Sequence, residues 1–175
     1  GDCTMSLTKL NNQSLSAVTS AGLPAGTVLQ TVSYSHSTMV DNLTTTFQDT
    51  NAVNLAITPV STSSKIYIMI NQTLQIWNQS AFSTGRWRVQ RSIGGGSYSS
   101  IQEDTSSTNG NLFAYDYGGS GLNIIWPTQF IFLDTPNTVS QVTYKTQIAK
   151  GSNGANRISS DVSNTGHTIL MEIAG

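Results

Sequence analysis

The sequence is short of charge, cysteine, histidine and proline. Eight Lys and Arg and nine Asp and Glu make up 10% of its 175 residues, against about 25% in an average domain. So few basic residues exclude the cationic surface that binds nucleic acid. No apolar run reaches the ~18 residues of a membrane-spanning helix. With one Cys and two His, the chain is a poor source of zinc ligands. We therefore expect no nucleic-acid or membrane partner, no metal and no cofactor.

Neutral polar residues take the place of the missing charge. The chain has 24 Ser, 23 Thr, 14 Asn and 11 Gln, besides 15 Gly. Its length fits one domain, and a domain of this size buries roughly 70% of its unfolded surface without a metal or disulfide. The composition is typical of a β-rich domain and argues against most classes of enzyme.

The start of the chain differs from the rest. We interpret residues 1–4, which precede Met5, as a cloning remnant. Residues 5–25 then form an arm and hinge, and residues 26–175 form the domain. Two interpretations of the arm stay open: an extended or disordered segment, or a short helix that packs on a partner chain. The second rests on four apolar residues near helical spacing, which are candidates for anchoring or oligomerisation: Leu7, Leu10, Leu15 and Val18.

The body of the chain shows the two-residue period of β-strands. Residues 65–76 place isoleucines on one parity, and residues 86–91 place Trp87 and Val89 opposite Arg86, Arg88 and Gln90. Residues 142–148 alternate in the same way. About nine or ten such strands, with no convincing helix after residue 20, predict an all-β antiparallel two-sheet sandwich. We favour a jelly-roll-like arrangement over an immunoglobulin-like one.

Three strands carry more specific expectations. In residues 27–35, Val28, Gln30 and Val32 are expected on one face. Residues 122–133 are apolar on both parities, which predicts a central strand covered on both sides and broken or bulged at Pro127. The last strand, 168–173, is expected to bury its apolar parity, which consists of Ile169, Met171 and Ile173.

Catalytic patterns are weak. His36 and His167 lie near expected strand ends without a nucleophile-elbow motif. Glu103 and Asp104 are adjacent, so in a strand they point to opposite faces and are unsuited to glycoside hydrolysis. Arg86, Arg88 and Arg91 form the one basic cluster. They indicate either inter-strand salt bridges or a contact to an acidic sugar or partner subunit.

Aromatic residues offer one indication of ligand binding. An exposed ring can stack on a sugar while neighbouring amides and carboxylates bond its hydroxyl groups, although most aromatic residues belong to a core. The candidates in turn-rich stretches are Tyr98, Tyr115, Asp116, Tyr117, Trp77 and Trp126.

Four segments, in order, resemble a family of bacteriophage virion domains common in marine and cyanobacterial phages. They are Gly26–Val32 (GTVLQTV), Ile57–Ile66 (ITPVSTSSKI), Phe132–Pro136 (FLDTP) with Val142–Lys145 (VTYK), and Thr168–Ile173 (TILMEI). The resemblance covers the chain from Gly26 onward. It implies a β-domain at the end of a tail fibre or other appendage, or a small stand-alone virion protein. It carries no catalytic residue with it.

We therefore expect a non-enzymatic structural protein located in the virion, where its partners are other virion proteins. It would act as a fibre tip that binds a host-surface glycan or as a capsid decoration protein. Low charge leaves few means of protecting sheet edges and apolar faces in a monomer, so we expect a homotrimer. The alternative is a stand-alone carbohydrate-binding module or lectin, which would be monomeric. A glycan-degrading enzyme is a third hypothesis, and the small number of acidic residues argues against it.

Overall fold

The computed structural model describes residues 23–50, 54–78, 82–103, 112–115, 123–151, 155–160 and 166–175. Its regular elements are all β-strands, and they form two antiparallel sheets, so the predicted all-β sandwich is confirmed. In chain order the strands are β1 (Val28–His36), β2 (Val40–Asn42), β3 (Gln48–Asp49), β4 (Leu55–Ile57), β5 (Lys65–Asn78), β6 (Phe82–Ile93), β7 (Ser99–Glu103), β8 (Leu112–Tyr115), β9 (Asn123–Asp134), β10 (Val142–Lys150), β11 (Ala155–Ser160) and β12 (Gly166–Ile173).

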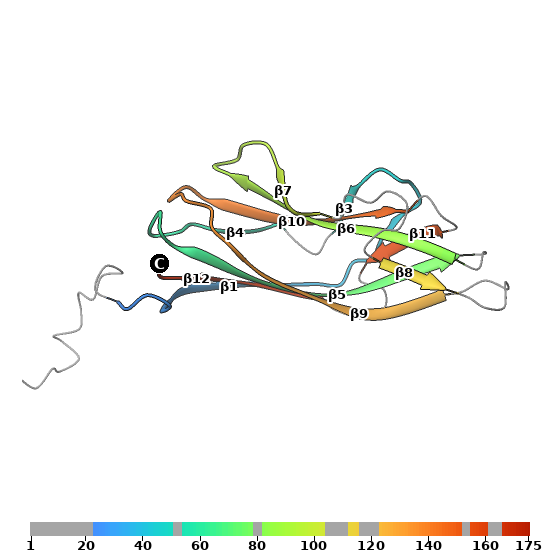
Figure 1. Cartoon of the computed structure of the whole chain (residues 1–175), viewed down its shortest axis with the longest axis horizontal. Helices are drawn as coiled ribbons and strands as arrows, with labels where there is room; N and C mark the ends of the chain where they lie inside the picture. Colours follow the sequence, from blue (N-terminus) through green and yellow to red (C-terminus); the bar gives the residue numbers. More distant parts are fainter. Residues whose placement is uncertain are drawn as a thin grey trace, which may run out of the picture.

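Each sheet is four strand positions wide, because short strands share a position end to end. In the first sheet, called sheet A, β5 pairs with β9 along one edge and with β12 and β11 along the other. β1 and β2 lie outside β12 and β11. In sheet B, β10 and β6 form the central pair. β3 and β4 flank β10, and β7 and β8 flank β6. Figure 1 shows the two layers one above the other.

The hydrophobic core fills the space between the sheets. The even-numbered positions of β5 from Ile66 to Ile76 point inward, and the isoleucines among them are fully buried, as is Gln72. Trp87 of β6 stacks on Phe130 of β9, with ring centroids 3.3 Å apart. This contact joins sheet B to sheet A. The predicted shared face of Trp87 and Val89 is therefore confirmed and is the inward one, and the two-residue period of β5 is confirmed as well.

The prediction for residues 122–133 is wrong. β9 pairs with β5 alone among the described strands, so it lies at the edge of sheet A. Its even positions face the core and its odd positions, which include Ile125, Ile131 and Leu133, are exposed. The register with β5 runs without a bulge through Pro127. An edge strand accommodates proline because one side of its backbone has no ladder partner.

Two other side-chain orientations also differ from expectation. In β12 the buried residues are Thr168, Leu170 and Glu172, while Ile169, Met171 and Ile173 face outward and are half-buried. In β1 an irregularity after Val28 changes the register, so Val28 pairs with the outward Ile173 and Gln30 pairs with the inward Glu172. Val28 is therefore not on the face of Gln30 and Val32. A bulge of this kind inserts one residue and turns the following side chains over.

The two ends of the described chain meet at one end of the sandwich. The backbone N–H of Gly26 donates to the carbonyl of Ala174, and the N–H of Ala174 donates to the carbonyl of Thr27, both at 2.8 Å. In Figure 1 the C-terminus lies beside β12 and β1 at this end. No helix in the described ranges is long and apolar enough to cross a membrane.

Candidate functional site

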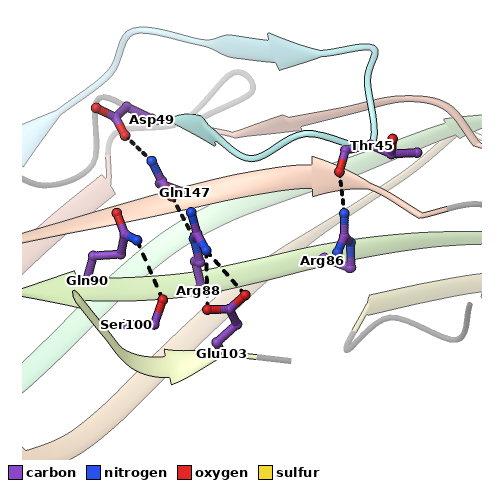
Figure 2. A network of polar contacts seen from close by, with 8 residues as sticks. All are labelled: Thr45, Asp49, Arg86, Arg88, Gln90, Ser100, Glu103 and Gln147. Atoms are coloured by element: carbon purple, nitrogen blue, oxygen red, sulfur yellow. Dashed lines mark hydrogen bonds and ion pairs between the residues drawn. The ribbon is translucent and has the colours of Figure 1, made fainter. Parts of the chain in front are cut away.

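A row of four polar side chains crosses the outer face of sheet B. Asp49, Gln147, Arg88 and Glu103 stand directly opposite one another on β3, β10, β6 and β7. Arg88 Nε donates to Gln147 Oε1 at 2.6 Å, and Arg88 Nη1 lies 3.2 Å from both carboxylate oxygens of Glu103. Gln147 Nε2 donates to Asp49 at 2.5 Å. Figure 2 shows these contacts, which tie four strands together.

Aromatic rings lie under the cations of the same face. The Arg88 guanidinium is 4.0 Å from the centroid of the Phe47 ring, and that of Arg86 is 4.8 Å from it. Arg86 also donates to the backbone carbonyl of Thr45 (Figure 2). The Lys145 ammonium lies 2.8 Å from Asp49 and 4.1 Å from the centroid of the Tyr98 ring. Cation–π contacts of this kind hold long side chains in place on an exposed sheet.

The two carboxylates of the row are held in their charged form. Burial by itself raises the pKa of Asp49, but hydrogen bonds from Lys145 and Gln147 outweigh it, so the pKa is lowered. The pKa of Glu103 is lowered first by a hydrogen bond from Ser100, against burial, with further help from Arg88. Neither acid is thus suited to donate a proton near neutral pH. Together with Lys145, the row balances two carboxylates with two cations and stabilises the sheet.

The three arginines of the basic cluster do not act together. Arg86 and Arg88 share the outer face of β6, as predicted, and both have partners within the chain. Arg91 points to the opposite face and pairs with Asp134 of sheet A. The inter-strand interpretation therefore accounts for the contacts of Arg88, and Arg91 joins the two sheets instead.

The structure separates the aromatic ligand candidates. Trp77, near the end of β5, is 40% exposed, and Tyr98 is 38% exposed at the start of the β7 hairpin. Trp126 points inward and packs against the core, which removes it as a stacking platform. Tyr115 ends β8, whose backbone pairs with the first residues of β6. Asp116 and Tyr117 lie outside the described residues, as do the arm candidates Leu7, Leu10, Leu15 and Val18.

Trp77 and Tyr115 belong to the same end of the sandwich. Trp77 is one residue before the end of β5, and Tyr115 pairs with Phe82, the first residue of β6. In Figure 1 these strand ends lie opposite the end that holds the C-terminus. Tyr98 directly precedes Ser99, which pairs with Arg91 near the other end of β6. The Lys145 ammonium lies over the Tyr98 ring. The candidate binding region therefore centres on the β5–β6 end.

A polar cavity that the sequence did not indicate lies at the edge of sheet A. It has a volume of about 520 Å³ and is lined by Tyr34, Ser35, His36, Ser37, Thr38 and Asn54. The Tyr34 and His36 rings stack with centroids 6.1 Å apart, and Tyr34 is exposed. Tyr34 was hidden from sequence reasoning because it lies within a strand, where an aromatic residue is usually core. An exposed ring among hydroxyl and amide groups suits a polar ligand.

The described residues do not assemble a catalytic constellation. Ser35 Oγ lies 3.0 Å from Nδ1 of His167, but this pair sits on the exposed outer face of sheet A. The other histidine, His36, is buried against Gly166. Within the described ranges, no group of three or more His, Cys, Asp and Glu is arranged to hold a metal ion.

Comparisons with known proteins give only distant matches. No family model matches the chain, and no curated protein matches it. Among solved structures, a VP2 subviral particle of infectious bursal disease virus matches with a TM-score of 0.37 and 10% identity. The Gx strain of the same virus matches with a TM-score of 0.36 and 9% identity. In both cases 85% of this chain is covered and 34% of the viral chain, so the chain spans about a third of their length. Similarity at this level carries no inference about function.

Proposed function

We propose that this chain is a non-enzymatic structural protein of a bacteriophage particle, a homotrimeric fibre-tip domain that binds a host-surface glycan. The segments that resemble the phage virion family support the first part of this proposal. They include the TPVSTSSK turn, which lies between β4 and the start of β5.

The fibre-tip function rests on one observation: the chain ends and the exposed aromatic candidate lie at opposite ends of the sandwich. The arm joins the domain at Gly26 beside Ala174. β5, which carries the exposed Trp77 one residue before its last, ends at the opposite end of the sandwich (Figure 1). A tip domain needs this arrangement, because the end that attaches to the particle must be remote from the end that meets the cell. Weak sites at the free end, repeated by trimer symmetry and by copies on the particle, add up to avidity.

A glycan array probed with the full chain tests the proposal. Trp77→Ala removes an exposed ring at the free end, and we expect it to abolish binding that the wild-type chain shows. Tyr98→Ala is the matched control, because Tyr98 is nearly as exposed but lies at the other end of β6, under Lys145. We expect the control to bind as the wild type does.

Three other results would contradict part of this proposal. Absence of binding to every sugar on the array would contradict the fibre-tip function and leave capsid decoration as the role in the particle. Sugar binding by a chain that stays monomeric in light scattering would favour a carbohydrate-binding module or lectin. Release of sugar from the array by the chain would contradict a non-enzymatic role.

A further inference from the structure

The outer face of sheet A is divided into an apolar half and a polar half. The apolar half lies beside the chain ends and contains eight outward-facing side chains: Val28, Tyr67, Met69, Ile131, Leu133, Ile169, Met171 and Ile173. Seven of them stand in register on three strands, β9, β5 and β12, and Val28 of β1 lies opposite Ile173. Thr31 and Ser33 of β1 lie opposite Met171 and Ile169 and form a polar border along this side. Leu133 lies opposite Tyr67, which lies opposite Met171, and the next row runs from Ile131 to Ile169 in the same way.

The polar half continues the same strands toward the other end. Its first row consists of Gln129, Asn71, His167 and Ser35, each opposite the next. All four are exposed. The change from one row to the next is therefore a change from isoleucine and methionine to amides and hydroxyls. Such a boundary marks out a specific apolar surface rather than scattered exposed side chains.

The eight residues carry no charge, and Lys65, which lies opposite Ile173 in the last row, is the one charged residue in the described rows. Proteins normally blunt an exposed sheet with charged side chains. Ile131 and Leu133 are 49% and 53% exposed on an edge strand, where that protection is most needed. Five of the chain's few charged residues lie instead on the outer face of sheet B: Asp49, Arg86, Arg88, Glu103 and Lys145.

The sequence pattern itself indicates that this surface is covered. β12 places its apolar parity outward, at Ile169, Met171 and Ile173, and β9 is apolar on both parities. Apolar residues at every second position are the signature of a buried strand face. Two strands on different edges of β5 thus carry this signature on the same side of sheet A, and within the described chain nothing is seen to bury it.

A second copy of this chain is the occupant that fits best. A surface whose one charged residue, Lys65, lies in its last row meets little electrostatic repulsion when it packs against itself. Four strands at ~4.8 Å spacing and five residues at ~3.4 Å give it a flat extent of roughly 320 Å². Stable interfaces bury about 800 Å² per partner, with an apolar centre and a polar rim. The apolar half would supply the centre, and the adjoining row of amides and hydroxyls would supply the rim.

The place where the arm enters agrees with this arrangement. Val28 and Ile173 form the last row of the apolar half, and Gly26 and Ala174 follow directly beyond them. If three copies face a common axis with this surface, Gly26 and Ala174 lie beside that axis.

We propose that the apolar half of sheet A is the surface through which copies of this chain pack against one another. This inference rests on the homotrimer of the proposed function and assigns its interface. The copies contact each other through Ile131, Leu133 and the outward residues of β12, and sheet B and the β5–β6 end remain free.

Two matched lysine substitutions test the interface in the full chain. Ile131 and Ile125 are 49% and 46% exposed on the same face of β9, but only Ile131 lies in the apolar half. We expect light scattering of the wild type to give three times the 18.7 kDa of one chain. Ile131→Lys is expected to give the mass of one chain at the same concentration, and Ile125→Lys is expected to keep the wild-type mass.

Thermal unfolding followed by circular dichroism shows whether each variant is folded, and Leu133→Lys serves as a second variant. A trimer that persists with both Ile131→Lys and Leu133→Lys overturns the interface and leaves the proposed function standing. A wild-type chain that is monomeric at every concentration overturns the inference together with the homotrimer, whether residues 1–22 or another protein then cover the surface. Loss of glycan binding with an intact trimer bears on the proposed function alone.

Discussion

Asp134 of sheet A accepts hydrogen bonds from Arg91 of sheet B across the interior of the sandwich. Arg91 Nη1 lies 2.7 Å and 3.0 Å from the two carboxylate oxygens. The hydroxyl of Tyr144, also from sheet B, donates to the same carboxylate at 2.7 Å. The Asp134 side chain is only 9% exposed. One carboxylate thus joins β9 to β6 and β10 beside the core.

The first prediction concerns this ion pair. Arg91→Met keeps most of the side-chain volume but leaves the Asp134 carboxylate with one donor fewer in a poorly hydrated position. Removal of one partner of a buried pair typically costs about 3–5 kcal/mol. Because Arg91 is partly exposed, we expect a loss of about 2–4 kcal/mol in the free energy of unfolding, measured by urea titration.

Arg86→Met is the control for this prediction, since Arg86 lies on the outer face of the same strand. We expect it to change stability by about 0.5 kcal/mol or less. Equal effects of the two substitutions would show that Arg91 does not join the sheets.

The second prediction concerns ionisation of Tyr144. Burial, and after it the hydrogen bond to Asp134, raise the pKa of Tyr144 above its ordinary value of 10.0. The neutral phenol is therefore favoured in the folded state, and the stability that this gives is full below pH 10 and is lost at higher pH. We expect Tyr144→Phe to leave the tyrosinate absorbance of the folded chain unchanged in an alkaline titration. A lower absorbance in Tyr144→Phe than in the wild type would show that Tyr144 ionises in the folded chain.

The third prediction concerns acid stability. The pKa values of Asp49 and Glu103 are lowered from 3.8 and 4.5. A carboxylate with a lowered pKa contributes stability that is present above its unfolded pKa and is lost as the pH falls through the folded pKa. The wild type should thus lose stability below about pH 4. The double variant Asp49→Asn, Glu103→Gln should lose less on the same acidification, as followed by urea titration at each pH. An unchanged pH dependence would contradict a stabilising role for the row on sheet B.

The fold and the core of sheet B could be predicted from the sequence, because alternation settles strand type. Trp87 and Val89 share one face of β6, and Arg86 and Arg88 share the other, as expected. Alternation says which residues share a face, but not which face is the core. In β12 the apolar parity was predicted to be buried, but the structure turns the parity that contains Glu172 inward.

The candidate sites were predicted less well for a related reason. Exposure of an aromatic residue depends on its place across the sheet, which a linear pattern does not contain. Trp126 and Trp77 lie in neighbouring strands, yet the first packs on the core and the second is exposed. Tyr34 was missed because β1 is an edge strand, where even an inward ring stays in contact with solvent.

The last prediction concerns Glu172, a carboxylate buried in the half of the sandwich beside the chain ends. Its oxygens accept hydrogen bonds from Gln30 Nε2 at 2.5 Å and from the backbone N–H of Val60 at 2.7 Å, so that it ties the turn before β5 to β1 and β12. Glu172→Ala removes the acceptor of the Val60 N–H, leaves Gln30 Nε2 with the Thr58 carbonyl alone, and opens a cavity, which should lower the free energy of unfolding by about 2–4 kcal/mol. Glu172→Gln keeps one acceptor oxygen and should cost about half as much, because only one of the two donors loses its partner. Urea titrations of both variants measure the difference, and equal losses would show that volume rather than hydrogen bonding makes this position important.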